Sequence, residues 1–389
     1  MITLNRVSLT VCGCLLVFAS FFSRAGLDLG VTVVPIHFIF IFVLLIGGLR
    51  FDTKVNVNEF LLLVFFMAFI LTALKAEDYL RSIIMIFGII FLMLYYIVSK
   101  SLLMRMSYED FHCFVLKLGK IILFLSIFYY IVGVFGFLLF GIAEREHFAG
   151  VLVEKGIIRF IGISTDPNFM AFSSLFFVFL FLSESSRLSK VYGALYIVVI
   201  VLTLSRGGVV SLFFGLFFFI LRYGFKYIIA FLTIGILSYF SLDVFLGGDV
   251  LLNVIDKRMA GLETGAGRVD IWGNALSLFK ENYLFGIGIF QFQTYNMLYF
   301  NDYHYAHNTY LEIMVEGGVI CSFLFFLFVS SLSYKCFKIY IEDKSLSWLF
   351  PAQISLFICI IGLTSYSNPL FYTFILLLNN YIYHGIKKK

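Results

Sequence analysis

The sequence predicts an all-α polytopic membrane protein with about twelve transmembrane helices. Of its 389 residues, 61% are hydrophobic and only 13% are charged, whereas a soluble domain has about 25% charged residues. A chain of this composition cannot hide its apolar surface from water, so lipid must be its solvent. The formal charge of +5 therefore gives no indication of nucleic acid as a partner, and the placement of Lys and Arg along the chain carries the information.

A membrane-spanning helix needs about 20 mostly apolar residues. Runs of this kind lie at about 5–23, 31–49, 59–75, 80–99, 118–142, 167–183, 189–205, 207–222, 225–246, 317–338, 347–365 and 368–384. The first run lacks a small-residue cleavage site, so we interpret it as a retained helix. We expect residues 1–389 to form a single transmembrane domain.

The basic residues predict the orientation of these helices. If the N-terminus is cytoplasmic, the cytoplasmic segments hold more than half of the 28 Lys and Arg residues and only a minority of the 23 Asp and Glu residues, as the positive-inside rule requires. An even number of spans places the Lys-rich C-terminus in the cytoplasm as well. Two long segments then lie outside, a shorter one at 143–166 and a larger one at 247–316.

The larger outer segment contains an amphipathic helix that begins near Arg268. Apolar residues recur one, four, seven, eight and eleven positions after Arg268, which is a helical spacing. Such a helix can lie on the bilayer surface or cover the helix bundle. Arg268 is a candidate to bind a phosphate or a sugar, and the alternative is an ordinary surface arginine. Arg159, in the shorter outer segment, is a weaker candidate of the same kind.

The most polar motif runs from Tyr303 to Glu312. Thr309 and Glu312 have the spacing of a capping box, in which Thr309 caps a new helix and Glu312 reaches back. His307 then lies just before a helix N-terminus, where the helix dipole favours a neutral imidazole. It is a candidate general base or hydroxyl-positioning group. The alternatives are a loop histidine that bonds to the backbone and, for Glu312, a capping role alone.

His304 and His307 do not predict a metal site. Glu312 is nearby, but the chain has neither an HExxH pattern nor a cysteine partner for these histidines. The six cysteines lie in or beside apolar runs and indicate no disulfide framework. No glycine-rich phosphate loop, nucleophile elbow or useful DxD motif occurs, and the cytoplasmic segments are too short to fold a nucleotide-sugar domain. We therefore expect no metal and no cofactor.

Two further motifs lie at predicted outer helix ends. Leu204-Ser205-Arg206-Gly207 joins two apolar runs with almost no loop, and an arginine there needs an anionic partner; the alternative is an arginine that extends to the lipid headgroups. In Asp166-Pro167-Asn168, Pro167 suits the first turn of a helix and Thr165 or Asp166 suits its cap. This predicts a helix N-terminus able to bind an anion, with a plain helix start as the alternative.

Together these motifs resemble the O-antigen polymerase and O-antigen ligase superfamily of bacterial membrane proteins. The resemblance covers roughly residues 160–325, and its motifs occur in the family's order. They are Asp166-Pro167-Asn168, Leu204-Ser205-Arg206-Gly207, Gly267-Arg268-x-x-Ile271-Trp272 followed by 281–288, and His307-Asn308-Thr309-Tyr310-Leu311-Glu312 with 316–320. One departure is Tyr283, where the family usually has proline before the Leu/Phe-Gly-x-Gly turn.

The resemblance implies a GT-C-like membrane glycosyltransferase that is inverting and independent of metals. It implies a donor glycan on undecaprenyl diphosphate, bound at the periplasmic face of the bacterial inner membrane. By this resemblance Arg206 and Arg268 stabilise the diphosphate leaving group, and His307 aims and deprotonates the acceptor hydroxyl. The residues expected to shape the binding site are Asp166, Asn168, Arg159, His304, Asn308 and Glu312.

Three functions remain open at this point. The favoured one is a polymerase that joins lipid-linked repeat units of O-antigen, capsule or exopolysaccharide, with a chain-length regulator protein as a further candidate partner. The second is a ligase that transfers the finished glycan to the lipid A core. The third is a flippase or transporter, which would require charged residues within its helices; here the charges lie mainly in the outer segments.

Overall fold

The computed structural model describes residues 6–22, 27–28, 32–33, 37, 41, 55–141, 143, 146–154, 156–224 and 268–387. The described part is mainly helical, as expected, and five of its helices are long and apolar enough to cross a membrane. These five are Val57–Lys75, Tyr79–Leu103, Tyr108–Phe140, Arg206–Tyr223 and Thr309–Glu342. The total of twelve spans stays a prediction. The spans expected at 31–49 and 225–246 lie outside the described residues, apart from residues 32–33, 37 and 41.

The chain divides into two compact units. Unit 1 comprises residues 1–119, 273–339 and 360–389, and unit 2 comprises residues 120–272 and 340–359. Unit 1 contains α1 (Arg6–Ala19), α3 (Val57–Leu71), η2 (Thr72–Lys75), α4 (Tyr79–Leu103), α12 (Phe292–Phe300), η4 (Ile360–Gly362), α15 (Pro369–Lys387) and most of α11 (Arg268–Glu281) and α13 (Thr309–Glu342). Two short strands, β1 (Leu27–Asp28) and β2 (Thr32–Val33), pair in an antiparallel ladder.

The core of unit 1 is aromatic and wraps around α4. Both α1 and α15 pack against α4, and α3 contacts α13 through Phe65 and Phe325, whose ring centroids are 5.1 Å apart. Helix α3 begins at a capping box, because Asn56 Oδ1 accepts from the Glu59 backbone N–H and Glu59 Oε2 accepts from the Asn56 N–H. Both bonds satisfy backbone donors that a helix start leaves open.

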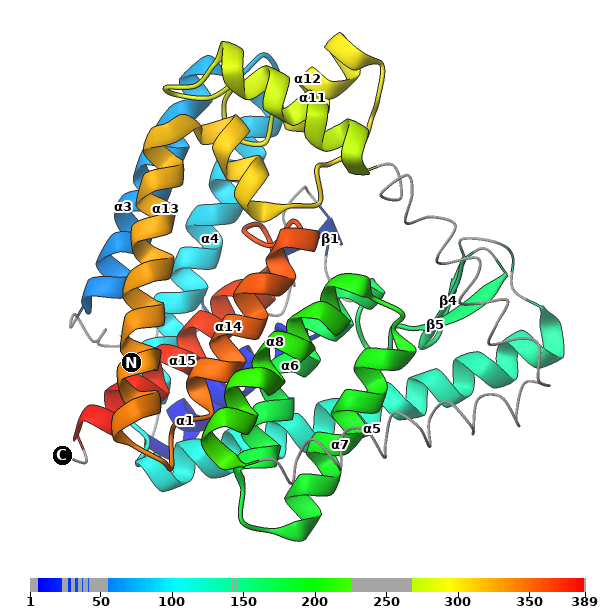
Figure 1. The fold of residues 1–389 in the computed structure, drawn as a ribbon, viewed down its shortest axis with the longest axis vertical. Helices are drawn as coiled ribbons and strands as arrows, with labels where there is room; N and C mark the ends of the chain where they lie inside the picture. Colours follow the sequence, from blue (N-terminus) through cyan, green and yellow to red (C-terminus); the bar gives the residue numbers. More distant parts are fainter. Residues whose placement is uncertain are drawn as a thin grey trace. The chain divides into compact units, whose positions relative to one another are not determined.

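Unit 2 is built around α6 (Pro167–Ser183), most of whose residues are buried. Helices α7 (Arg187–Leu202), α8 (Arg206–Tyr223) and α14 (Leu349–Cys359) pack on it, and α6, α8 and α14 lie side by side in Figure 1. Gly208 permits the close approach of α8 to α6, because a Cβ there would lie 2.6 Å from the Ala171 Cβ. The long helix α5 (Tyr108–Phe140) runs through both units.

The shorter outer segment contains a small sheet that an all-α prediction does not include. Strands β3 (His147–Phe148), β4 (Val151–Glu154) and β5 (Ile157–Phe160) are antiparallel in the order β3-β4-β5. Strand β4 pairs Val151 with Phe160 and Glu154 with Ile157, and its residues alternate between buried and half-buried. The alternation of period two is the signature of a half-buried strand, so the sequence carried this signal.

Several predicted helix boundaries shift in the structure. Helix α5 begins about ten residues before the predicted start at 118. Helix α13 joins the helix predicted to begin at Thr309 to the span predicted at 317–338. The span predicted at 347–365 ends as an α-helix at Cys359 and as a 3-10 turn at Gly362. Helix α13 is kinked at Gly318, which has φ 68 and ψ −169.

The amphipathic helix of the larger outer segment is confirmed as α11, but its apolar stripe was assigned the wrong phase. The buried side chains are Ile271, Ala275 and Leu278, whereas Val269 is 62% exposed and Leu276 is 45% exposed. Both sets of residues have helical spacing, because this helix is apolar on more than one side. Only the neighbours against which it packs decide which stripe is buried.

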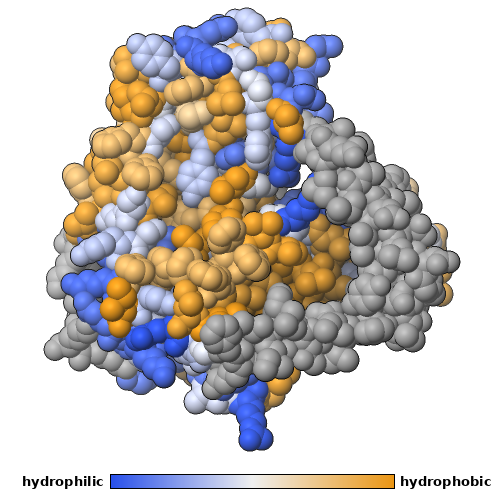
Figure 2. All heavy atoms as spheres, in the orientation of Figure 1, coloured by the Kyte–Doolittle hydropathy of each residue, from blue (hydrophilic) through white to orange (hydrophobic). Residues whose placement is uncertain are grey.

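The surface of the described residues has the character expected of a protein in lipid. Large apolar side chains on the long helices are exposed, among them Phe60 and Met67 of α3 and Phe213 of α8, and apolar residues cover much of the visible face (Figure 2). In water such surfaces would be unfavourable by about 25 cal/mol per Å². The structure thus supports a membrane protein, while its orientation stays a prediction.

Candidate functional site

The N-terminus of α6 is capped as the sequence predicted. Asp166 is the cap, with its Oδ1 accepting from the backbone N–H groups of Asn168 at 2.7 Å and Phe169 at 3.3 Å, and Pro167 is the first helical residue. The Asn168 side chain connects this helix end to the next motif, because its Oδ1 accepts from the Ser205 hydroxyl at 2.8 Å. Two segments almost forty residues apart in the chain are thereby joined.

The turn that carries Arg206 is short and held by its own side chains. Leu204 has a left-handed backbone with φ 51, and Ser205 caps α8 by accepting from the Gly208 N–H at 3.2 Å. Arg206 is the first residue of α8 and is exposed. An arginine at a helix N-terminus adds its charge to the positive end of the helix dipole, so this turn attracts anions.

Arg159 has a supporting position on β5. It is buried, its Nε donates to the Thr203 carbonyl at 2.9 Å, and its Nη1 is 2.6 Å from Glu154 Oε2. Thr203 is the C-cap of α7. Arg159 therefore binds one of the carbonyl oxygens that have no hydrogen-bond partner within the helix at its C-terminal end. Arg159, which the sequence predicted as a substrate contact, therefore also stabilises the turn that carries Arg206.

Arg268 lies in the electrostatic field of the other unit 2 residues. Burial lowers the pKa of its guanidinium below the ordinary value, the Asp166 carboxylate raises it, and the charges of Arg206 and Arg159 lower it further. An arginine stays protonated at any physiological pH. The shift therefore reports positive charge that is partly desolvated and concentrated around Asp166, which is an arrangement suited to an anionic ligand.

The His307 motif lies in unit 1, and its capping differs from the prediction. Asn308, not Thr309, caps α13: its Oδ1 accepts from the Leu311 N–H at 3.2 Å. Glu312 does reach back, but its Oε1 accepts from the His307 backbone N–H at 3.1 Å. His307 is exposed and has a left-handed backbone with φ 48. The prediction that His307 lies just before a helix N-terminus is confirmed.

Thr309 takes part in a different contact, with the segment before α15. Its hydroxyl donates to the Leu363 carbonyl at 2.5 Å and lies 3.0 Å from the Ser365 hydroxyl, and it accepts from the Ser365 N–H at 2.9 Å. The Thr309 N–H also donates to the Leu363 carbonyl, at 3.0 Å. A threonine used in this way cannot serve as the side-chain cap, which explains why the cap shifts to Asn308.

Two buried carboxylates follow on successive turns of α13. Glu312 is 1% exposed, and its Oε1 also accepts from the Thr364 hydroxyl at 2.7 Å. Its Oε2 has no hydrogen-bond partner among the described residues. Glu316 is 2% exposed and accepts from the Phe292 N–H at 3.0 Å and from the Tyr366 hydroxyl at 2.8 Å.

A glycine turn is packed against the kink of α13. The N–H groups of Ile287 and Gly288 donate to the carbonyls of Val315 and Glu316, both at 3.0 Å. Gly286 has φ 71, and a Cβ there would lie 2.3 Å from the Glu316 oxygen. Tyr283, in place of the usual proline, accepts from the Val319 N–H at 2.8 Å, so the turn forms despite this departure.

An arginine that the sequence reasoning missed anchors the segment before His307. Arg81 of α4 donates to Gln293 Oε1 at 2.7 Å, to the Tyr303 hydroxyl at 2.9 Å and to Thr294 Oγ1 at 3.2 Å. His304, by contrast, has a largely exposed side chain that contacts Asp302. Thr364 and Tyr366 were also missed. The polar residues 364–368 lie where the predicted spans 347–365 and 368–384 meet, so they were assigned to helix ends and not to a functional segment.

The predicted site residues thus fall into two groups. Unit 2 brings together the cluster of Arg159, Asp166, Asn168, Arg206 and Arg268, which we call the arginine cluster, although Arg159 and Asp166 serve partly as structural contacts. Unit 1 contains His304, His307, Asn308 and Glu312, with Thr364, Glu316 and Tyr366 as additional neighbours. The roles of all these residues stay predictions.

The fold and these motifs define a helical membrane protein with a positively charged cluster and a histidine at a helix start. Residues 191–326 match the family model described as O-antigen ligase. The resemblance to the O-antigen polymerase and ligase superfamily is thereby confirmed, and this family of membrane glycosyltransferases includes both polymerases and ligases. The match includes Arg206, Arg268 and His307. No curated protein matches the chain significantly.

Proposed function

We propose that the protein is a polysaccharide polymerase that joins oligosaccharide repeat units carried on undecaprenyl diphosphate. The reaction transfers the growing glycan from its lipid diphosphate to a hydroxyl group of another lipid-linked unit, with inversion at the anomeric carbon. It needs neither metal nor cofactor. The observation that carries this proposal is the arginine cluster: Arg206 begins α8 at a turn held by Arg159 and Asn168, and Arg268 is partly withdrawn from solvent in the field of Arg206 and Arg159.

The arginine cluster is suited to a diphosphate leaving group. As the bond between the sugar and the diphosphate breaks, negative charge develops on the phosphate oxygens, and fixed positive groups stabilise that charge without reorganisation. Arg206 and Arg268 take this role, and Arg159 and Asn168 hold the turn that presents Arg206. Arginine suits the task because its planar donors bind phosphate in pairs.

His307 is suited to the acceptor. The helix start behind it favours the neutral imidazole, which can accept the proton of an attacking hydroxyl. The bond from its own N–H to Glu312 fixes the backbone that carries the ring. Glu312 Oε2, buried and without a described partner, is available to accept from a sugar hydroxyl, and Asn308 and His304 complete this group.

The second candidate is an O-antigen ligase, favoured by the description of the matching family model. A ligase uses the same donor chemistry but transfers the glycan to the lipid A core. In both cases we place the enzyme in the bacterial inner membrane, with cytoplasmic termini and a periplasmic active site. A chain-length regulator protein is a proposed partner of the polymerase only.

The two candidates differ in what accumulates when the gene is deleted. Loss of a polymerase leaves single lipid-linked repeat units, whereas loss of a ligase leaves long chains on undecaprenyl diphosphate. Electrophoresis of extracted lipid-linked glycans distinguishes these outcomes. We expect single repeats, restored to long chains by the wild-type gene but not by Arg206→Ala. Long lipid-linked chains in the deletion strain would establish the ligase instead.

A further inference from the structure

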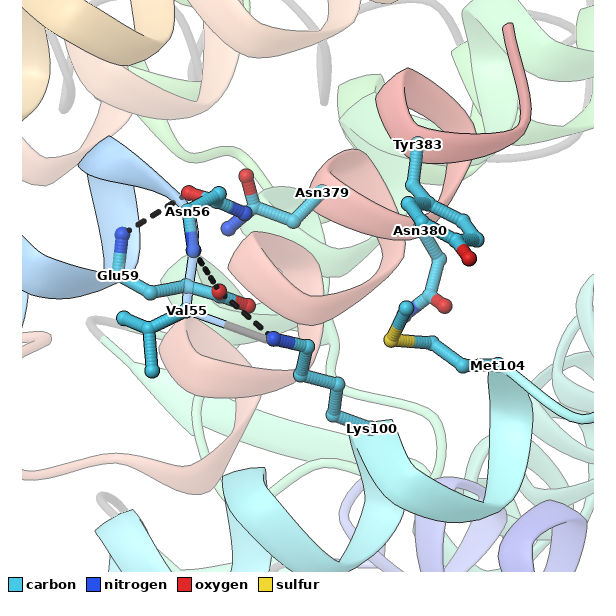
Figure 3. A pocket seen from close by; sticks show the side chains of 8 residues that line it. All are labelled: Val55, Asn56, Glu59, Lys100, Met104, Asn379, Asn380 and Tyr383. Atoms are coloured by element: carbon cyan, nitrogen blue, oxygen red, sulfur yellow. Dashed lines mark hydrogen bonds and ion pairs between the residues drawn. The ribbon is translucent and has the colours of Figure 1, made fainter. Parts of the chain in front are cut away.

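A pocket lies at the end of unit 1 where α3 begins, α4 ends and α15 nears its end. Its volume is about 120 Å³, many times the roughly 10–15 Å³ that one water needs on this measure. Glu59 and Lys100 lie on one side of it, and Asn380, Tyr383 and Met104 lie on the other (Figure 3). Within unit 1, the segment before His307 contacts the opposite end of α4, through Arg81.

One wall of the pocket is a closed polar network. Glu59 Oε2 is 2.7 Å from Lys100 Nζ, and Glu59 Oε1 accepts from the Tyr96 hydroxyl at 2.9 Å. The Asn379 amide donates to the Tyr96 hydroxyl at 3.0 Å. The charge of Glu59 also acts on Lys335, so two lysines accompany this one carboxylate. Lys335 does not line the pocket, so among the described lining residues the ammonium of Lys100 is the positive group on this side, and it is paired with Glu59.

The other wall contains a buried acceptor that is not satisfied. Asn380 is 2% exposed, and its Nδ2 donates to the Leu376 carbonyl at 2.9 Å. Its Oδ1 has no hydrogen-bond partner among the described residues. A buried amide oxygen without a partner is unfavourable by about 1–3 kcal/mol, so a ligand with a hydrogen-bond donor would satisfy it. The Tyr383 ring beside it can attract a cation through its face.

The location of the pocket selects the class of ligand. It lies at the ends of membrane-spanning helices, which is the level of lipid headgroups. Next to it, Val55, Val57 and Phe60 expose 60%, 59% and 56% of their surface, so apolar side chains border its entrance. Acyl chains can pack on these residues while a polar headgroup enters the pocket.

We propose that this pocket binds the headgroup of a phospholipid that carries a primary ammonium, such as phosphatidylethanolamine. The ammonium donates a hydrogen bond to Asn380 Oδ1 beside Tyr383, and the phosphate faces the ammonium of Lys100. Under the predicted topology this lipid belongs to the cytoplasmic leaflet. The site does not depend on the proposed transferase reaction and is separate from its residues.

The test uses the purified full-length protein in detergent with phosphatidylethanolamine or phosphatidylcholine of identical acyl chains. The two lipids differ in that the choline nitrogen has no N–H to donate. Native mass spectrometry measures which lipid remains bound, and we expect roughly a threefold to tenfold preference for phosphatidylethanolamine, the effect of about one hydrogen bond. Equal retention of the two lipids would overturn the proposal.

Variants locate the preference in the pocket. Asn380→Leu removes the acceptor, and Val55→Trp covers the entrance from an exposed position that does not disturb the core. Both should reduce the preference to near unity, whereas the control Met67→Trp, at an exposed position of α3 that does not line the pocket, should retain it. If Asn380→Leu does not fold, Val55→Trp decides alone. A preference unchanged in Val55→Trp would contradict the assignment.

A competition experiment distinguishes a lipid from a soluble compound with the same headgroup. Phosphoethanolamine added at the concentration of the lipid should not displace bound phosphatidylethanolamine, because it has no acyl chains to pack beside the entrance. Displacement at that concentration would show that the pocket takes a soluble metabolite and would overturn the lipid proposal.

Discussion

His307 and Leu204 adopt left-handed backbone conformations, with φ values of 48 and 51. For residues other than glycine this conformation is unfavourable by about 1–2 kcal/mol. Both residues lie within two positions of a helix start, and both belong to motifs expected to bind substrate. Strain of this kind persists where the surrounding contacts determine the backbone, and it clusters at functional sites.

Replacing His307 by asparagine tests the role of the imidazole without changing the left-handed backbone conformation of this residue. Asparagine tolerates the left-handed region better than most residues, so we expect normal protein levels and a similar melting temperature. Glycan polymerisation should fall by about 10²–10⁴-fold, the usual effect of losing a general base. Rates of product formation in membranes measure this. His304→Asn is the control and should retain most activity; equal losses in the two variants would argue against the role of His307.

Arg268 provides a second test at the level of single residues. Arg268→Ala removes one partly buried positive charge from the arginine cluster, and we expect the transfer rate to fall by about 10²–10³-fold. Arg268→Lys restores the charge but not the paired donors and should recover only part of the rate. Lys280→Ala, at the exposed other end of α11, is the matched control. An Arg268→Ala enzyme as fast as this control would exclude Arg268 from the site.

At the scale of elements, helix positions followed from the sequence more closely than helix ends and contacts. Apolar runs predicted α6 and α8 to within a residue, because lipid-spanning helices must be apolar over their whole length. The cap at Asn308 could not be predicted from the sequence. The Thr309 hydroxyl forms hydrogen bonds with Leu363 and Ser365, which are more than fifty residues away in the chain. The sheet at 147–160 was missed because its strands are short compared with the helices around it.

The kink in α13 gives a prediction about backbone conformation. Gly318→Ala places a Cβ 2.4 Å from the Leu284 carbonyl oxygen at a residue with φ 68, so the glycine turn and the kink can no longer pack. We expect strongly reduced accumulation or a clearly lower melting temperature in detergent. Gly273→Ala is the control, because nothing lies within 4 Å of its Cβ and alanine favours helix by about 1 kcal/mol. Normal stability of Gly318→Ala would refute this account of the kink.

The contact between α13 and the segment before α15 can be tested through Tyr366. Tyr366→Phe removes the hydroxyl that donates to Glu316 Oε2 and leaves a buried carboxylate oxygen with one donor fewer. The expected loss of stability is about 1–3 kcal/mol, measured by thermal unfolding in detergent. Tyr283→Phe, at a side chain that is 61% exposed, should change little. Indistinguishable melting temperatures for the two variants would show that this hydrogen bond contributes little.

At the scale of the whole molecule, composition predicted a helical membrane protein and ordered motifs predicted its superfamily. The motif residues themselves also followed from the sequence, including the arginines of unit 2 and His307 of unit 1. Their supporting contacts did not, because Arg81, Thr364 and Tyr366 act through partners that lie far from them in the sequence. The sugars and their linkage depend on the substrate, and no motif in the chain encodes them.

The central claim is that this protein polymerises lipid-linked repeat units through Arg206 and His307. The most direct measurement is reconstitution of the purified protein in liposomes with an undecaprenyl-diphosphate-linked repeat unit as the only glycan. We predict a ladder of products spaced by one repeat, formed without added metal, and no ladder with Arg206→Ala or His307→Asn. A wild-type protein that leaves the repeat unit unextended, or an Arg206→Ala variant that extends it at the wild-type rate, would contradict the account.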